Sequence, residues 1–138
     1  MFSTKTDGRE SQPIDVALRI GIVVSALTTA AIHFSLGSLL YVANTFGYVV
    51  LAVALVAPIA IAVRFQWLTR LALIGFTMAT IGGWLLFGAR YDVAYLSKGI
   101  EVLMLVLLGT EVVRGGGVRA IVSEVRRLFA TLSRVPSR

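Results

Sequence analysis

The feature that most constrains this chain is a series of four long apolar stretches, at residues 17–36, 43–63, 69–88 and 94–113. A helix needs about 20 mostly apolar residues to cross the hydrocarbon core of a bilayer, and each stretch is of that length. Hydrophobic residues make up 57% of the chain and charged residues only 14%, a balance that would leave a soluble domain with large exposed apolar patches. The sequence therefore predicts an integral membrane protein.

Short polar connections separate the four stretches, with the sequences "GSLLYVAN", "RFQWLTR" and "GARYDV". None of them is long enough to hold a soluble domain. Four helices joined by such turns favour an up-down-up-down bundle. The predicted fold class is therefore all-α: a polar cytoplasmic tail at 1–16, a four-helix transmembrane bundle at 17–113, and a C-terminal amphipathic helix at 117–134.

Basic residues near the ends of the stretches predict the orientation of the chain, because lysine and arginine favour cytoplasmic connections. Six arginines lie between Arg114 and Arg138, whereas the first connection has no basic residue and the third has Arg90. The other basic residues of the predicted cytoplasmic side are Lys5, Arg9, Arg19, Arg64 and Arg70. We therefore expect both termini to be cytoplasmic.

Two patterns within the spans predict local geometry. Gly75, Ala79 and Gly83 recur every four residues in the third span, and such a stripe of small residues favours close helix packing over a cofactor groove. Pro58 lies inside the second span and leaves the carbonyl of Ala54 without its usual donor, so we expect a kink there.

The segment "VRAIVSEVRRLFATLSRV" has apolar residues at helical spacing, with Arg119, Arg126 and Arg127 on much of the remaining surface. This pattern predicts a basic amphipathic helix that lies in the cytoplasmic interface and contacts anionic lipid headgroups. The alternative is a docking helix for another membrane subunit, a second copy or a cytoplasmic partner. One short basic helix without an accompanying fold does not favour nucleic-acid binding.

The stretch "YLSKGIEVLMLVLL" places a lysine and a glutamate inside the fourth span. At 1.5 Å per residue, Glu101 lies about 10 Å below the start of its helix, too deep for the aromatic belt to explain it. Lys98 and Glu101, at i and i+3, can form an ion pair, or Glu101 can be protonated. When the spans are aligned by depth, five further residues join this pair in one cluster on the outer side of the membrane: His33, Asn44, Tyr48, Trp84 and Tyr95.

Three interpretations of this cluster stay open. It can specify helix packing through a buried ion pair, with His33 and Asn44 hydrogen-bonded across helices. It can be a pocket for an apolar molecule with a polar end, such as a quinone, lipid or pigment. It can also serve a proton or cation step that uses Glu101 and His33.

His33 is the only histidine, so it cannot supply bis-histidine haem ligation within one chain. Five-coordinate haem or a pigment magnesium would need only this ligand, but a hydrogen-bonded histidine is the favoured interpretation, and no cofactor or metal site is predicted. The chain has no cysteine, which excludes disulfides and thiolate chemistry within it. It also has none of the common catalytic motifs, so an enzyme is not favoured.

The motifs "AAIHFSLG", "NTFGYVVLAVAL", "ALIGFTMATIGGWLLFG" and "YLSKGIEVLMLVLL" resemble those of a family of small four-helix bacterial and archaeal integral membrane proteins of unknown function. The resemblance implies a compact four-helix unit in the cytoplasmic membrane of a prokaryote, and it implies no reaction. The expected function is that of a non-enzymatic accessory or stabilising subunit of a larger membrane assembly. The alternatives are a binder of a small apolar redox or lipid ligand, and a component of a proton- or cation-coupled transporter.

Overall fold

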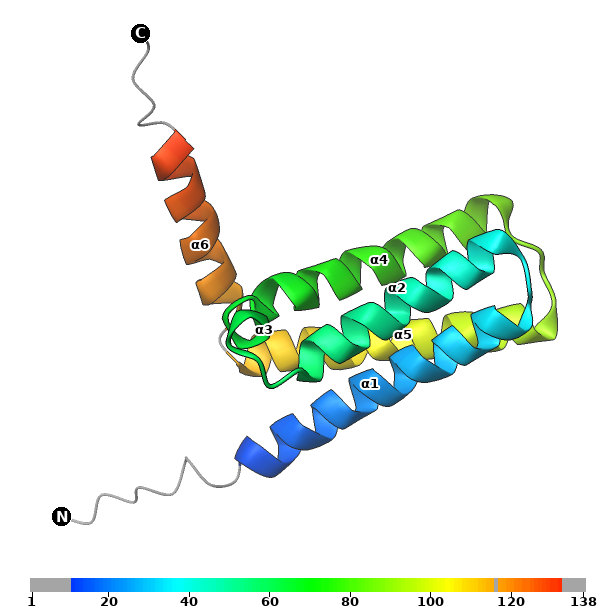
Figure 1. Ribbon diagram of the computed structural model, residues 1–138, viewed down its shortest axis with the longest axis horizontal. Helices are drawn as coiled ribbons and strands as arrows, with labels where there is room; N and C mark the ends of the chain where they lie inside the picture. Colours follow the sequence, from blue (N-terminus) through cyan, green and yellow to red (C-terminus); the bar gives the residue numbers. More distant parts are fainter. Residues whose placement is uncertain (1–10, 116, 133–138) are drawn as a thin grey trace, which may run out of the picture.

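The computed structural model describes residues 11–115 and 117–132, and all regular elements in these residues are α-helices (Figure 1). The helices are α1 (Ser11–Ser35), α2 (Leu39–Val56), α3 (Ala60–Arg64), α4 (Gln66–Phe87), α5 (Asp92–Arg114) and α6 (Gly117–Leu132). Within the described part of the chain, three helices are long and apolar enough to cross a membrane: α1 from Pro13, α2 and α4. This finding indicates a membrane protein. The 23-residue α5 is not among the three, and it carries two buried glutamates.

The helices α1, α2, α4 and α5 lie side by side, and we call these four the bundle (Figure 1). Contacts join α1 to α2, α2 to α4, α4 to α5 and α5 back to α1, so the four helices enclose one core. The buried apolar side chains of this core come from all four helices: Ile22, Ala26, Ala30, Tyr48, Ala52, Leu55, Leu73, Met104 and Leu108.

The two ends of the bundle differ in their connections, and we name them after the buried glutamates of α5. The Glu101 end holds the connections from α1 to α2 and from α4 to α5, whereas the Glu111 end holds the start of α1, the end of α5 and α3 (Figure 1). At the Glu101 end, Gly37 has a φ of 71°, a left-handed conformation that glycine adopts without steric cost. This turn is shorter than expected, because α2 begins at Leu39 and Asn44 lies inside it.

Pro58 breaks the second predicted span instead of kinking it. Ala57 is extended, with a ψ of 123°, as expected for a residue before proline. Helix α2 therefore ends at Val56, and the five residues of α3 follow as a separate helix. The segment predicted as one span at 43–63 is two helices.

Helix α1 begins at Ser11, before the predicted start of the first span at residue 17. Pro13 falls in the first turn of α1, where proline is tolerated because the amide hydrogen it lacks would have no helical partner. Residues 11–16 are thus helical, and residues 1–10 of the predicted tail lie outside the described residues.

The glycine run after Arg114 coincides with the boundary between two helices: α5 ends at Arg114 and α6 begins at Gly117. Helix α6 projects from the Glu111 end of the bundle (Figure 1). The last two residues of the helix predicted at 117–134 lie outside the described part of the chain.

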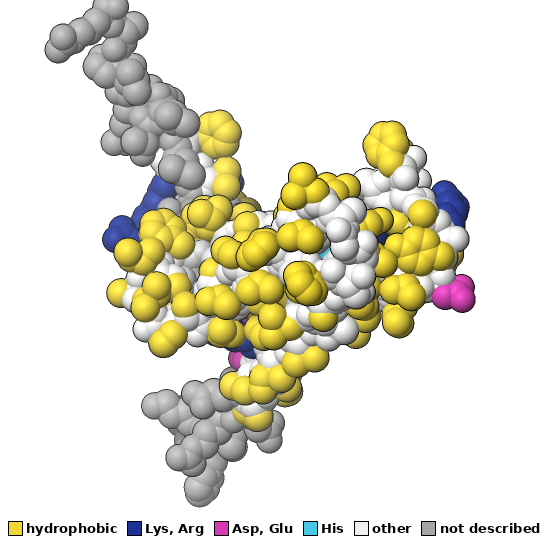
Figure 2. All heavy atoms as spheres, turned by 45° about the vertical axis from the view of Figure 1, so that its right-hand side comes forward, with side chains coloured by type: hydrophobic (Ala, Val, Ile, Leu, Met, Phe, Trp, Pro, Cys, Tyr) yellow, Lys and Arg dark blue, Asp and Glu magenta, His cyan; other side chains and the backbone are white. Residues whose placement is uncertain are grey.

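The surface of the bundle is largely apolar. Figure 2 shows hydrophobic side chains over the middle of the visible face, with lysine and arginine side chains toward its two ends. Leu86 of α4 is 75% exposed and Val106 of α5 is 60% exposed. Such a surface suits contact with lipid chains, which are as apolar as these side chains.

Candidate functional site

A buried ion pair lies at the centre of the Glu101 end. Glu101 is fully buried, and the Lys98 ammonium donates to its two carboxylate oxygens at 2.8 and 2.7 Å. The pair follows from sequence spacing, because residues three apart share a helix face.

A hydroxyl chain supports this carboxylate from two other helices. Thr80 of α4 has its hydroxyl oxygen 2.9 Å from Glu101 Oε2 and 2.8 Å from the Thr77 carbonyl oxygen. Both of these oxygens only accept, so the single Thr80 hydrogen goes to one of them. The Tyr48 hydroxyl, 2.9 Å from Thr80 Oγ1, must therefore donate to Thr80. The chain from Tyr48 through Thr80 to Glu101 joins α2, α4 and α5.

His33 of α1 completes the cluster. Its Nδ1 lies 2.8 Å from the Thr29 carbonyl oxygen of the same helix, so this hydrogen bond does not cross between helices as one interpretation required. Its Nε2 is 3.8 Å from Glu101 Oε1, which is longer than a hydrogen bond. The imidazole ring packs 5.7 Å from the Tyr41 ring and 6.0 Å from the Tyr48 ring, centre to centre.

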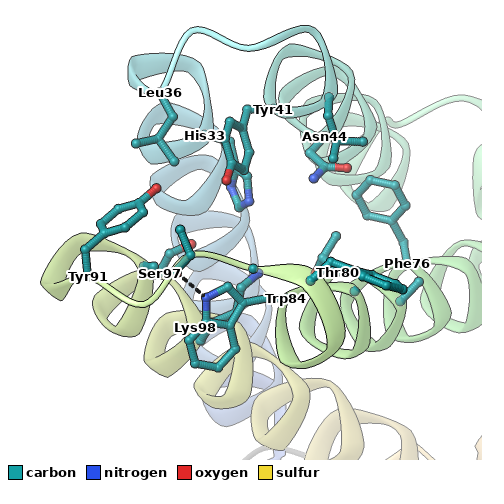
Figure 3. Close-up of a pocket in the computed structure, with 17 residues that line it drawn as sticks. His33, Leu36, Tyr41, Asn44, Phe76, Thr80, Trp84, Tyr91, Ser97 and Lys98 are labelled. Carbon is teal, nitrogen blue, oxygen red and sulfur yellow. Dashed lines mark hydrogen bonds between the residues drawn. The ribbon is translucent and has the colours of Figure 1, made fainter.

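A cavity of about 480 Å³ lies against this cluster, between the ends of the four bundle helices (Figure 3). Its wall is mostly apolar and aromatic, with a few polar groups. The lining residues are His33, Leu36, Leu40, Tyr41, Asn44, Phe76, Ala79, Thr80, Gly83, Trp84, Phe87, Gly88, Ala89, Tyr91, Ala94, Ser97 and Lys98. The size and the composition of the wall are those of small-molecule sites.

The structure brings four of the predicted cluster residues to the cavity wall: His33, Asn44, Trp84 and Lys98. Figure 3 shows them around one open space, with His33 beside Tyr41 and Asn44 across from Lys98. The Trp84 indole donates to the Ala89 carbonyl oxygen at 3.0 Å, which fixes the indole at the wall.

The other three predicted residues do not line the cavity. Tyr48 and Glu101 are fully buried behind the wall, where they hold Thr80 and Lys98. Tyr95 is 52% exposed and packs edge-on against Trp84, with 5.2 Å between ring centres. Tyr95 therefore contacts the wall residue Trp84 from outside the cavity, a contact between α4 and α5.

Tyr91, in the connection from α4 to α5, adds an aromatic ring that the predicted cluster did not include. Desolvation, followed by the interaction with Tyr41, raises the pKa of the Tyr91 hydroxyl above its ordinary value. This phenol is therefore uncharged at neutral pH.

The small-residue stripe of α4 has a different role from the one predicted. A Cβ atom added to Gly75 or Gly83 would meet no atom within 4 Å, so neither glycine permits a close helix contact within the described chain. Ala79 and Gly83 instead line the cavity. Their small size leaves the space that larger side chains would fill.

Sequence reasoning missed a second buried carboxylate, at the Glu111 end. Glu111 is 6% exposed. Its Oε1 accepts hydrogen bonds from Arg19 Nη2 of α1 at 2.9 Å and from Arg70 Nη2 of α4 at 3.1 Å. The sequence did contain a signal for this cluster. Arg19, Arg70 and Glu111 all lie near the predicted cytoplasmic side of their spans, and therefore at a similar depth.

The three C-terminal residues predicted to contact lipid or a partner are all exposed on α6: Arg119, Arg126 and Arg127. Val125 and Phe129 of the same helix are 40% and 69% exposed. Helix α6 therefore presents both basic and apolar side chains on its surface. Among the described residues, no group of three or more His, Cys, Asp or Glu side chains is placed to hold a metal ion.

No protein-family model, no curated protein and no solved structure matches this chain. The resemblance to the family of four-helix membrane proteins stays a prediction.

Proposed function

We propose that this chain is a four-span, non-enzymatic membrane protein that binds a small amphiphilic molecule in the cavity at the Glu101 end. One observation carries the proposal: a mostly apolar cavity of about 480 Å³ lies directly against a buried, hydrogen-bonded polar cluster. Small-molecule sites combine these two features, because apolar walls provide affinity and a few polar groups fix orientation.

The packing of α5 supports its assignment as the fourth span. It contacts α1 and α4 along the bundle, and its outward residues Val102, Leu103 and Val106 are 50%, 52% and 60% exposed. Its buried charges have partners, since Lys98 neutralises Glu101 and two arginines surround Glu111. Charge pairing lowers the cost of placing ionisable groups inside a membrane.

The distribution of arginines supports an orientation with the Glu111 end in the cytoplasm. Arg64 and Arg114 are the last residues of α3 and α5, and Arg19 and Arg70 contact Glu111, so all four lie toward this end of the bundle. Basic residues favour the cytoplasmic side. The cavity then lies near the outer leaflet, from which an amphiphile can enter.

A binding role fits the interior better than passage of a proton or cation. Between the two carboxylate clusters, Leu73 of α4 and Met104 and Leu108 of α5 are fully buried. The same part of the interior also holds the buried hydroxyls of Ser25, Thr29 and Thr77, but no ionisable side chain is among its buried described residues. A proton or cation path through a membrane typically uses such ionisable groups. We therefore place the transporter hypothesis below the binding hypothesis.

A leucine placed in the cavity tests the proposal. Gly83→Leu puts a side chain into the cavity, and the backbone tolerates it because an added Cβ meets no atom within 4 Å. Gly75→Leu is the matched control, since Gly75 is equally unobstructed, lies in the same helix and does not line the cavity. We expect a stoichiometric small molecule to co-purify with the wild type and Gly75→Leu but not with Gly83→Leu.

The measurement is an absorption spectrum of each purified variant, followed by solvent extraction and mass spectrometry. A wild-type preparation that carries no stoichiometric ligand, and that takes up none from a membrane extract, would refute the binding role. Equal ligand content in Gly83→Leu and Gly75→Leu would place the ligand outside this cavity.

The exposed apolar residues of α6 favour a second role as an accessory or stabilising subunit of a larger membrane assembly. Val125 and Phe129 lie on a helix that projects from the bundle, where a partner helix or the lipid interface can cover them. We expect Phe129→Asp to release a partner that co-purifies with the wild type in mild detergent. A lone monomer in the wild-type preparation would argue against the subunit role.

A further inference from the structure

We infer that the cavity selects an uncharged head group that both donates and accepts hydrogen bonds, such as a phenol or a quinol, over an acid or an amine with the same tail. This inference rests on the proposed binding function and specifies the chemistry of the ligand. Three features of the cavity wall carry it: charge balance, the hydrogen-bonding groups of the wall and the aromatic lining.

The wall has no uncompensated charge. Lys98 is the one permanently charged side chain among the lining residues, and its ammonium is paired with both oxygens of Glu101. An anionic head group would add a second negative charge beside an ammonium that Glu101 already neutralises, and a cationic head group would find the carboxylate occupied. Because an unpaired charge is costly in an apolar cavity, an uncharged head group is favoured.

His33 offers a ring nitrogen to this cavity. The Thr29 carbonyl oxygen only accepts, so the His33 Nδ1 atom, 2.8 Å away, is the donor of this hydrogen bond. The other ring nitrogen, Nε2, is 3.8 Å from Glu101 Oε1, which is longer than a hydrogen bond. Because Nε2 does not hydrogen-bond to Glu101, a ligand hydroxyl can form a hydrogen bond with it.

Donors to the head group come from α5 and α2. The Lys98 ammonium has three hydrogens, and its contacts with the two Glu101 oxygens leave one for a ligand. The Ser97 hydroxyl has no partner within the described chain although the residue is 3% exposed, and Ser97 borders the cavity. Asn44 adds an amide that both donates and accepts (Figure 3).

The lining favours a flat ring next to the head group. Five aromatic residues contribute to the wall: Tyr41, Phe76, Trp84, Phe87 and Tyr91. Aromatic rings pack edge-on or offset against one another with favourable geometry. A ring that carries a hydroxyl, with an alkyl tail toward lipid, satisfies the wall and the polar end together.

Three probes with one tail and three head groups test the selectivity: 4-decylphenol, 4-decylbenzoate and 4-decylbenzylamine. Trp84 lines the cavity whereas Trp67 does not, so quenching of the remaining tryptophan in the Trp67→Phe variant reports binding. We expect the phenol to bind about tenfold more tightly than either charged probe, the discrimination that one well-placed hydrogen bond provides.

Each result decides a different claim. Equal binding of the three probes, or tighter binding of the acid or the amine, would overturn the selectivity and leave the binding function standing. If none of the three probes binds, the binding function itself fails. His33→Leu should reduce phenol affinity about tenfold and leave benzoate affinity nearly unchanged. The comparison of the three probes decides the inference even if that variant does not fold.

Discussion

At the scale of single residues, α5 holds two glutamates whose buried carboxylates are neutralised in different ways. Glu101 has a lysine of its own helix at 2.7 Å, whereas Glu111 has arginines from α1 and α4 at 2.9 and 3.1 Å. The first pair is local in sequence. The second joins three helices, so its loss should affect the assembly of the bundle more directly.

Glu111→Gln should lower the free energy of unfolding by about 1–3 kcal/mol, because it removes a charged acceptor from two guanidinium groups. The loss should stay below the cost of breaking a fully buried pair, since Arg19 and Arg70 are 34% and 21% exposed. Asp15→Asn is the control: its partner Arg114 is 37% exposed and Asp15 is 51% exposed. This exposed pair should contribute less than about 1 kcal/mol. Thermal unfolding in detergent measures both variants, and an equal effect would contradict the prediction.

Glu101→Gln should destabilise the bundle by about 3 kcal/mol, because it leaves the Lys98 ammonium without a counter-charge in a buried place. Lys98 has a side chain only 11% exposed. The double variant Lys98→Met with Glu101→Gln removes both charges and should recover much of the loss. A double variant no more stable than the single one would show that the cost does not come from the unpaired ammonium.

At the scale of elements, one glycine sets how closely α2 approaches α4. A Cβ atom added to Gly47 would lie 2.9 Å from Phe76 Cε1 and closer still to Phe76 Cζ, so the ring would have to move. The Phe76 ring is itself held edge-on against Tyr48, with 4.9 Å between ring centres. The contact therefore positions the helix that carries Thr80 and the helix that carries Tyr48.

Gly47→Ala should destabilise the protein by about 1–3 kcal/mol, the usual cost of overpacking a filled contact. Gly75→Ala, where an added Cβ meets nothing within 4 Å, should be neutral or slightly stabilising because alanine favours helices. Adding Phe76→Leu to Gly47→Ala should restore part of the lost stability, because leucine is smaller than phenylalanine. Thermal unfolding of Gly47→Ala, Gly75→Ala and this double variant tests the contact. Similar melting temperatures for the two glycine substitutions would exclude it.

At the scale of the whole molecule, the bundle places its two carboxylate clusters at opposite ends, with apolar side chains between them. The proposed topology puts the Glu101 end outside and the Glu111 end in the cytoplasm. The chain has no cysteine, so single introduced cysteines can report the topology without background.

In whole cells, Ala89→Cys should react with a membrane-impermeant maleimide, whereas Ile59→Cys should react only after the membrane is opened. Ala89 is exposed in the connection at the Glu101 end, and Ile59 is 60% exposed near α3 at the Glu111 end. Labelling of both sites from outside, or of Ile59→Cys alone, would reject the proposed orientation.

Much of the secondary structure could be read from the chain, because long apolar runs, Gly37 and the glycines after Arg114 mark helices and their ends. The break at Pro58 was expected only as a kink, since the sequence does not reveal whether a helix resumes directly after proline. The cluster around Glu101 was partly predictable, because depth in a span follows from counting residues. Depth alone does not give the rotation of a helix, so it could not show that Tyr95 packs on the outer side of Trp84 while Lys98 faces the cavity.

The sequence by itself determined the apolar environment, the helical class and the Lys98–Glu101 pair, because hydropathy, length and i,i+3 spacing are local properties. Only the tertiary structure decided that Ala79 and Gly83 border a cavity and that Glu111 meets Arg19, which is 92 positions away. The physical reason is that a membrane helix can be apolar on its lipid face and on its core face alike. Its hydrophobic pattern therefore does not fix which side turns inward, and the contacts between helices do.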